Sequence, residues 1–198
     1  ISERSAENPD CVNAHAMALL TMNRAAEALV VTQAALDRRL DSWDDPKARA
    51  WTLDIQARAL RDLGRPDEAL VAWRTATRPE TGGGVGQDLN LADALLEQDQ
   101  PAETLTIVSG VKPDQVSAFG RMVAANLAVC ANARLGDRAG TDLALAALAA
   151  DRDAAPMLEM SGRLCAGDQD GAAAILIAQL KDPETRLDAL ADAQDYPL

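Results

Sequence analysis

Amphipathic stretches run along most of the chain, and short polar or glycine-containing turns separate them. Apolar residues at helical spacing indicate helices that bury one face against a neighbour. The clearest junction is the segment LGRPDEAL, residues 63–70, in which one stretch ends and the next begins. The pattern predicts helices over 10–22, 25–40, 46–63, 66–78, 87–98, 101–109, 114–135, 138–150, 154–165, 169–181 and 183–194.

One turn residue marks the junction inside each expected helix pair. These residues are Asn23, Gly64, Asp99, Gly136 and Gly167, spaced by 41, 35, 37 and 31 residues. The spacings scatter around the period of about 34 residues that is typical of a helix-turn-helix repeat. The three glycines stand where the end of a helix needs a left-handed residue, a conformation that glycine adopts without steric cost.

Prolines mark the starts of several expected helices. Pro66 and Pro101 are predicted in the first turn, where the missing N–H has no partner to lose. The pairs Asp45-Pro46 and Asp182-Pro183 add a carboxylate that can cap the helix ahead of the proline.

Residues 46–79 carry the most specific pattern. It consists of Ala57 and Leu60, the Gly64 turn, then Ala69, Trp73, Ala76 and Pro79. This segment resembles a tetratricopeptide (TPR) repeat, in which small residues lie where paired helices touch and a large aromatic ring fills the space beside them. The resemblance implies an all-α fold, a right-handed superhelical array of about five antiparallel helix pairs with a C-terminal capping helix. The expected single domain covers 1–198, with repeats at 9–43, 44–80, 86–112, 114–152 and 153–182 and the cap at 183–194.

The composition of the 198 residues favours the same fold class. There are 41 Ala and 26 Leu, but Val and Ile together number only 15. Strands draw on β-branched and aromatic residues, so a sandwich, a barrel and a doubly wound sheet are not expected. Arg outnumbers Lys by 16 to 3, which indicates a GC-rich bacterial genome and leaves cytoplasm and periplasm open.

The charge balance and the apolar runs exclude several function classes. The net charge of -12 repels phosphate backbones, and only five aromatic residues are available to stack on bases. The longest apolar runs, 143–150 and 172–178, are far too short to span a bilayer. We therefore expect neither a nucleic-acid partner nor a membrane span.

We predict no enzyme activity, cofactor or metal site. Cys11, Cys130 and Cys165 with the single His15 cannot supply a four-ligand zinc site, and Cys130 and Cys165 are interpreted as small buried residues. His15 is interpreted as a core or groove residue, because no nucleophile or orienting carboxylate can be assigned to it. The segment 168–171, DQDG, is better explained as a capped helix start than as a calcium loop.

Two segments between the second and fourth repeats stand out. The glycine-rich run 82–86 lacks both the strand and the Gly-Lys-Ser/Thr of a phosphate loop, so we predict a mobile connector or hinge. Residues 79–111 contain no Lys or Arg and carry a charge of -6. This acidic run is either a solvated face or a patch that attracts a basic partner segment.

The TPR resemblance implies that the first helix of each repeat lines a concave face where a protein or peptide partner binds. Trp51 is the expected anchor, with burial between the first two repeats as its alternative. The Lys and Asn pattern by which some TPR proteins hold a chaperone's terminal carboxylate is absent, so an adaptor of another kind is expected. The expected partner-binding residues are Asn13, Met17 and Leu20, then Trp51, Asp54, Arg58 and Arg61, then Leu89, Asp93 and Leu96, then Asn126, followed by Cys130.

The sequence leaves three functions open. The first is a non-enzymatic scaffold or adaptor that binds a peptide segment or partner domain in the groove. The second is a regulatory or assembly domain of a larger protein, because the chain begins with Ile1 rather than Met. The third is homo-oligomerisation through apolar residues of the fourth and fifth repeats, namely Leu143, Leu145, Leu148, Ile175 and Ile177.

Overall fold

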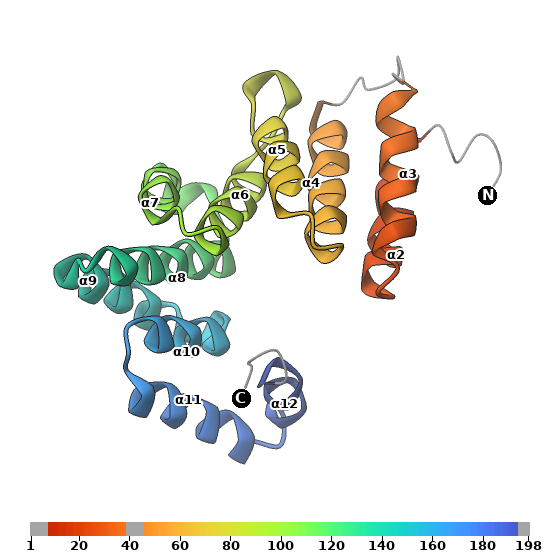
Figure 1. Ribbon diagram of the computed structural model, residues 1–198. Helices are drawn as coiled ribbons and strands as arrows, with labels where there is room; N and C mark the ends of the chain where they lie inside the picture. Colours follow the sequence, from red (N-terminus) through yellow and green to blue (C-terminus); the bar gives the residue numbers. More distant parts are fainter. Residues whose placement is uncertain (1–7, 39–45, 194–198) are drawn as a thin grey trace. The chain divides into compact units, whose positions relative to one another are not determined.

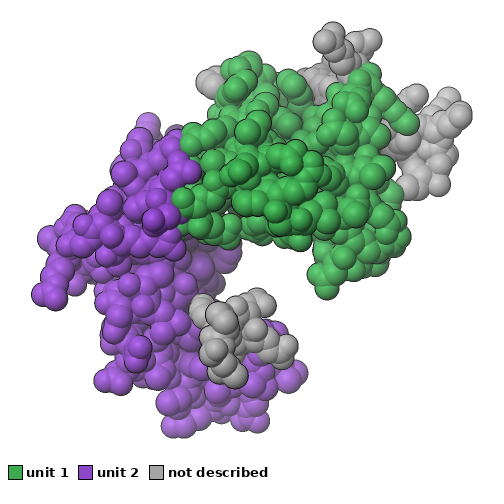
Figure 2. Space-filling view, in the orientation of Figure 1, with its two compact units in different colours: residues 1–98 green, residues 99–198 purple. Residues whose placement is uncertain are grey.

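The computed structural model describes residues 8–38 and 46–193, and within them it is all-helical, with eleven α-helices and no strand (Figure 1). The all-α prediction is therefore confirmed. The chain divides into two compact units, residues 1–98 and residues 99–198, called unit 1 and unit 2 below (Figure 2). No helix of the described residues is long and apolar enough to cross a membrane.

Unit 1 contains α2 to α6 and one 3-10 turn, η1. Unit 2 contains α7 to α12 and the turns η2 and η3. The elements of unit 1 are α2 (Pro9–Thr21), α3 (Ala25–Asp37), α4 (Pro46–Asp62), α5 (Pro66–Ala76), η1 (Pro79–Thr81) and α6 (Val85–Glu97). Those of unit 2 are α7 (Pro101–Ser109), η2 (Pro113–Gln115), α8 (Ala118–Leu135), α9 (Arg138–Ala150), η3 (Arg152–Ala154), α10 (Pro156–Cys165), α11 (Gln169–Lys181) and α12 (Arg186–Ala193).

All five predicted turn residues have a left-handed backbone. Their φ angles are 57° at Asn23, 71° at Gly64, 58° at Asp99, 73° at Gly136 and 79° at Gly167. Asparagine and aspartate are the residues other than glycine that tolerate this region best. The helices that these turns connect begin and end within four residues of the predicted ranges.

The starts of α8 and α12 come later than predicted, and local hydrogen bonds explain both. Before α8, a 3-10 turn precedes Ser117, whose hydroxyl accepts from the N–H of Gly120 and caps the helix at 3.1 Å. Before α12, Asp182 accepts from the N–H of Glu184, and Thr185 donates to the carbonyl of Gln179. These bonds hold the residues after Pro183 in a turn. The cap predicted at Asp45 lies outside the described residues.

The core of unit 1 is built on alanine. Helix α4 packs against α2, α3 and α5, and α6 packs against α4 and α5. Ala16, Ala28, Ala57 and Ala69 are fully buried, and Trp73 is 2% exposed. Small residues let the helix backbones approach closely, and the indole fills the remaining space.

Unit 2 has a separate core on the long helix α8. This helix packs against α7, α9 and α10, and α11 packs between α10 and α12. Met122, Val129, Ala144 and Leu148 form the buried cluster. The small residue Gly162 of α10 permits this packing, because a Cβ there would meet the side chain of Leu148.

The glycine-rich run is a packed connection in unit 1, which differs from the mobile connector that the sequence predicted. Gly82 has φ +69°, and a Cβ there would lie 2.6 Å from Cβ of Pro46. The hydroxyl of Thr81, which is 2% exposed, bonds to backbone carbonyls including that of Ala76 at 3.0 Å. Glycine is required here for close approach between backbone segments, and η1 packs against α4.

Candidate functional site

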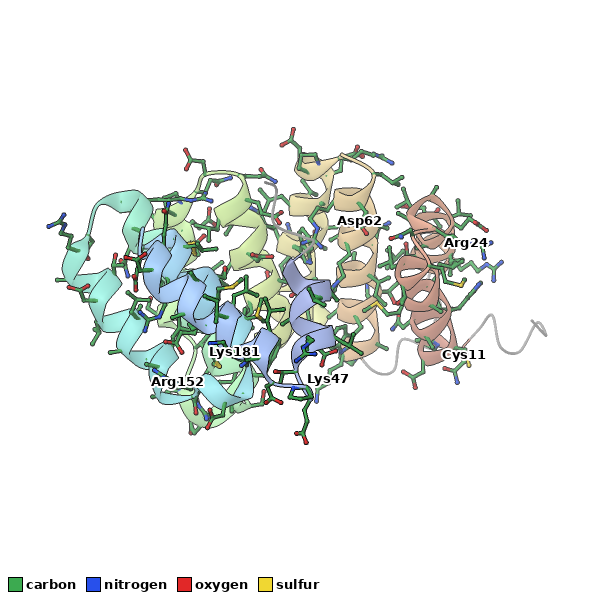
Figure 3. The ribbon with its side chains drawn as sticks, turned by 90° about the horizontal axis from the view of Figure 1, so that it is seen from below. Cys11, Arg24, Lys47, Asp62, Arg152 and Lys181 are labelled. Carbon is green, nitrogen blue, oxygen red and sulfur yellow. A yellow bond between two sulfur atoms is a disulfide. The ribbon has the colours of Figure 1, made fainter. Side chains whose placement is uncertain are left out.

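The exposed side of α4 carries the most distinctive surface residues of unit 1. At 100° per residue, Lys47, Trp51, Arg58 and Asp62 lie within about 60° of one another around the helix axis. We call these four residues the α4 ridge. Lys47 and Asp62 mark its two ends in Figure 3. Trp51 is 45% exposed. The alternative prediction, that Trp51 is buried between neighbouring helix pairs, is therefore wrong.

A buried carboxylate beneath this ridge holds Arg58 in place. Asp54 is fully buried, and its Oδ2 accepts from Nε of Arg58 at 2.9 Å. Its Oδ1 accepts from Nε1 of Trp73 at 2.9 Å and from Nδ2 of Asn90 at 2.7 Å. A buried charge needs such partners, because leaving it unpaired is costly. Arg58 therefore presents a guanidinium whose position is set by residues from three helices.

Arg61 is a further basic residue of α4 and faces α6. Its guanidinium lies 5.7 Å from the centroid of the Trp73 ring, a cation–π distance. Its Nη1 lies 3.8 Å from a carboxylate oxygen of both Asp93 and Glu97. Arg61 thus compensates part of the negative charge of residues 79–111, although it lies at least 32 residues away from Asp93 and Glu97 in the chain.

The carboxylates of this cluster have shifted pKa values. Burial raises the pKa of Asp93, and the neighbouring Arg61 and Arg58 oppose the shift. Burial also raises the pKa of Glu97, with a further increase from Asp93 and Asp62. Asp62, Asp93 and Glu97 all lie within 4 Å of Arg61, and only Asp93 is also affected by Arg58, so this part of unit 1 favours additional positive charge.

Of the three expected partner-binding residues on α2, Asn13 and Leu20 contact neighbouring helices and Met17 is exposed. Nδ2 of Asn13 donates to the carbonyl of Ala48 at 3.1 Å, and its Oδ1 accepts from the hydroxyl of Thr52 at 2.7 Å. Asn13 therefore joins α2 to α4. Met17 is 37% exposed, and Leu20 is half-buried in the contact between α2 and its neighbours.

Five of the expected partner-binding residues are buried, among them Cys130. Asp54 is covered by α5 and α6, and Leu89 and Leu96 belong to the core. In unit 2, Nδ2 of Asn126 donates to the carbonyl of Leu158 at 2.9 Å and ties α8 to α10. Their positions on helical stripes were predicted from periodicity, but the stripes face neighbouring helices and leave these residues no surface for a partner.

Two residues of the site were not expected there. Trp73 was assigned to packing alone, yet its indole N–H also holds Asp54. Asn90 gave no signal in the sequence, because its importance depends on a carboxylate 36 residues away. No sequence pattern pairs either residue with Asp54, because both hydrogen bonds join different helices.

The cysteines of unit 2 differ from the prediction. Cys130 of α8 and Cys165 of α10 form a disulfide with a Cα–Cα distance of 4.9 Å, and Cys165 is exposed. Cys130 is buried, as predicted, but it is bonded and not a free apolar side chain, and the prediction that Cys165 is buried is wrong. Cys11 is exposed and free.

The residues considered above for catalysis or metal binding either lie apart from one another or have a structural role. His15 is exposed on α2 rather than lying in a core. Asp168 caps α11 by accepting from the N–H of Gly171 at 2.9 Å, which agrees with the capped helix start predicted for 168–171. Within the described ranges, no three His, Cys, Asp or Glu residues are grouped so that they could hold a metal ion.

Neither a protein-family model nor a curated protein matches the sequence. The geometry of the α4 ridge is therefore the basis for a functional argument. An exposed indole can bury an apolar side chain, and a fixed guanidinium two turns along the same face can pair with a carboxylate, which are the two requirements of a recognition site.

Proposed function

We propose that the chain is a TPR-like, non-enzymatic interaction scaffold that binds an extended segment of a partner protein along the α4 ridge. The left-handed turns at near-regular spacing and the alanine-lined helix contacts support the TPR-like arrangement. The observation that carries the binding proposal is the pairing of Trp51, 45% exposed, with Arg58, which the buried Asp54 holds in place.

The ridge defines the chemistry of the segment. Trp51 and Arg58 are seven residues apart, or about 10 Å along the helix axis. An extended peptide covers that distance in about three residues. We infer a segment with an apolar side chain against Trp51 and a carboxylate about three positions away against Arg58. Preorganisation of the guanidinium reduces the entropy lost on binding.

Peptides selected on the immobilised chain from a random phage-displayed library test this proposal. The selected peptides are expected to combine an apolar and an acidic residue at that spacing. Trp51→Ala and Arg58→Gln should each weaken their binding at least tenfold, because each removes half of the contact. Leu187→Ala, at a 77% exposed position in unit 2, is the control and should bind like the parent.

Circular dichroism of each variant separates lost binding from lost folding. Arg58→Gln keeps a hydrogen-bond donor for Asp54, so the helical signal should be retained. If Trp51→Ala binds the selected peptides as tightly as the parent, the ridge is not the binding site.

A second candidate function, self-association, is favoured by exposed apolar residues in unit 2. Leu143 of α9 is 75% exposed and Ile177 of α11 is 50% exposed. Light scattering of the parent and of Leu143→Gln with Ile177→Gln tests this candidate. A concentration-independent monomer mass for the parent contradicts it.

A further inference from the structure

A groove lies on the opposite side of α4 from the ridge, between α3 and α5. We call it the outer groove, and its volume is about 840 Å³. Leu53, Gln56 and Leu60 of α4 form its floor. At 100° per residue, Leu53 and Leu60 lie about half a turn around the helix from Trp51. The outer groove and the α4 ridge are therefore separate surfaces of the same helix.

The two walls of the outer groove run in the same direction. Nε2 of Gln56 donates to Oε1 of Gln33 at 2.7 Å, and Ala28 packs in one cluster with Ala59. Residue numbers fall along α3 as they rise along α4, so these helices are antiparallel. Helix α5 follows α4 after a three-residue turn and packs against it, so it is antiparallel to α4 as well. Consequently α3 and α5 are parallel.

The groove is apolar at its floor and along both walls. Leu53 and Leu60 are 7% and 6% exposed at the floor. Val30 on the α3 wall and Val71 on the α5 wall are 69% and 66% exposed, although both line the groove. Two large aliphatic side chains left open on facing walls indicate a surface that a partner covers.

Acidic side chains lie at both ends of this apolar surface. Asp37 lies in the last turn of α3 and Asp67 in the first turn of α5. Because the two helices are parallel, these carboxylates are at opposite ends of the groove, about two helical turns apart. Arg65, the basic residue among the lining side chains, is held by Glu68 through two 2.7 Å hydrogen bonds. The lining thus has a net charge of -2.

We propose that the outer groove binds an amphipathic helix of a partner protein that carries a basic residue at each end of its apolar stripe. A helix satisfies its own backbone hydrogen bonds, which suits a groove that offers mainly aliphatic side chains. Basic residues about two turns apart on that helix match Asp37 and Asp67. A second copy of the chain is the weaker occupant, because two molecules of net charge -12 repel each other.

Two labelled peptides serve as probes. Both are 16-residue helices with leucines at i, i+3 and i+7, and they differ only in flanking residues, Lys in one and Glu in the other. Fluorescence anisotropy should show that the Lys peptide binds the full chain at least tenfold more tightly than the Glu peptide. Raising the salt concentration should weaken binding of the Lys peptide, because part of the attraction is electrostatic.

Variants locate the binding surface. Val30→Gln with Val71→Gln should weaken binding of the Lys peptide at least tenfold, and Asp37→Asn with Asp67→Asn should remove most of its salt dependence. Leu187→Gln, a 77% exposed position in unit 2, is the matched control and should have no effect. Trp51→Ala should also have no effect, which keeps this proposal distinguishable from binding at the α4 ridge.

Three results would overturn the proposal. The first is equal affinity for the Lys and Glu peptides, and the second is full binding by the Val30→Gln, Val71→Gln variant with an unchanged circular dichroism spectrum. The third is a parent dimer in light scattering that the same variant converts to a monomer, since a second copy would then occupy the groove.

Discussion

The indole Nε1 of Trp73 donates a 2.9 Å hydrogen bond to Oδ1 of Asp54, and both side chains are buried. The bond joins α4 to α5, while Asn90 brings α6 to the same oxygen. A residue whose bulk fills the alanine-lined core of unit 1 thus also supplies the donor that a buried carboxylate requires. Stability and the position of Arg58 depend on the same aspartate.

We expect Asp54→Ala to lower the free energy of unfolding by about 3 kcal/mol. The substitution leaves the buried donors of Trp73 and Asn90 without an acceptor, and each unsatisfied group is costly. Urea unfolding followed by circular dichroism measures the effect. Asp62→Ala, an exposed aspartate of the same helix, is the control and should stay within about 0.5 kcal/mol of the parent. Equal unfolding midpoints for the two variants would contradict this assignment.

Gly83, in the connection before α6, and Gly86, in the first turn of α6, should respond in opposite ways to alanine. In Gly83→Ala the new Cβ would collide with the carbonyl oxygen of Ala76, so we expect a loss of about 2 kcal/mol. In Gly86→Ala the Cβ meets open space within the first turn of α6, so we expect a gain of about 0.5 kcal/mol. Thermal unfolding of both variants gives the comparison. A mobile connector would tolerate both substitutions equally.

Reduction of the disulfide should destabilise unit 2 selectively. Cys130 and Cys165 are 35 residues apart, and closing a loop of that length contributes about 3 to 4 kcal/mol in the chain-entropy description. Calorimetry with and without dithiothreitol measures the loss, and Cys11→Ser is the control. Thiol titration of the oxidised protein should find one reactive cysteine, and a count of three would disprove the bond.

The carboxylate cluster on α6 should oppose stability at neutral pH. The pKa values of Asp93 and Glu97 are raised in the folded protein, so folding favours their protonated forms. Their contribution to stability therefore rises as the pH falls through the raised pKa values and is complete below the unfolded ones. The side chains are 48% and 52% exposed, so solvent screening keeps the effect below about 1 kcal/mol.

Asp93→Asn with Glu97→Gln tests that sign. The double variant should be more stable than the parent at pH 7, and the difference should vanish near pH 3, where both carboxylates are protonated even in the unfolded chain. Urea midpoints at the two pH values give the result, with the exposed Glu80→Gln as control. A variant less stable than the parent at pH 7 would mean that the contacts with Arg61 dominate.

The helices and their turns could be predicted from the sequence because their causes are local. A residue with a left-handed backbone ends a helix whatever surrounds it. Asn23, Gly64 and Gly136 could be predicted as such residues because Asn and Gly favour this conformation. For Trp51 the sequence left exposure and burial open, because its exposure depends on neighbouring helices that periodicity does not specify.

The interior of the candidate site could not be predicted, because its contacts join distant parts of the chain. Asp54 lies on the same helical stripe as Arg61, and only the packing of α5 and α6 makes one buried and the other half-exposed. The disulfide left no local signal either. Cys130 lies six residues before Gly136 and Cys165 two residues before Gly167, so the spacing of 35 residues does not put them at matching positions of α8 and α10.

The bond between Cys130 and Cys165 encloses the whole of α9 in a covalent ring. A single backbone cut inside that ring, for instance after Arg152 in η3, does not release a fragment. The nicked protein would migrate as one species on a denaturing gel until a reductant separates the pieces. Unit 2 can thus lose the continuity of its main chain while its helices remain tethered to each other.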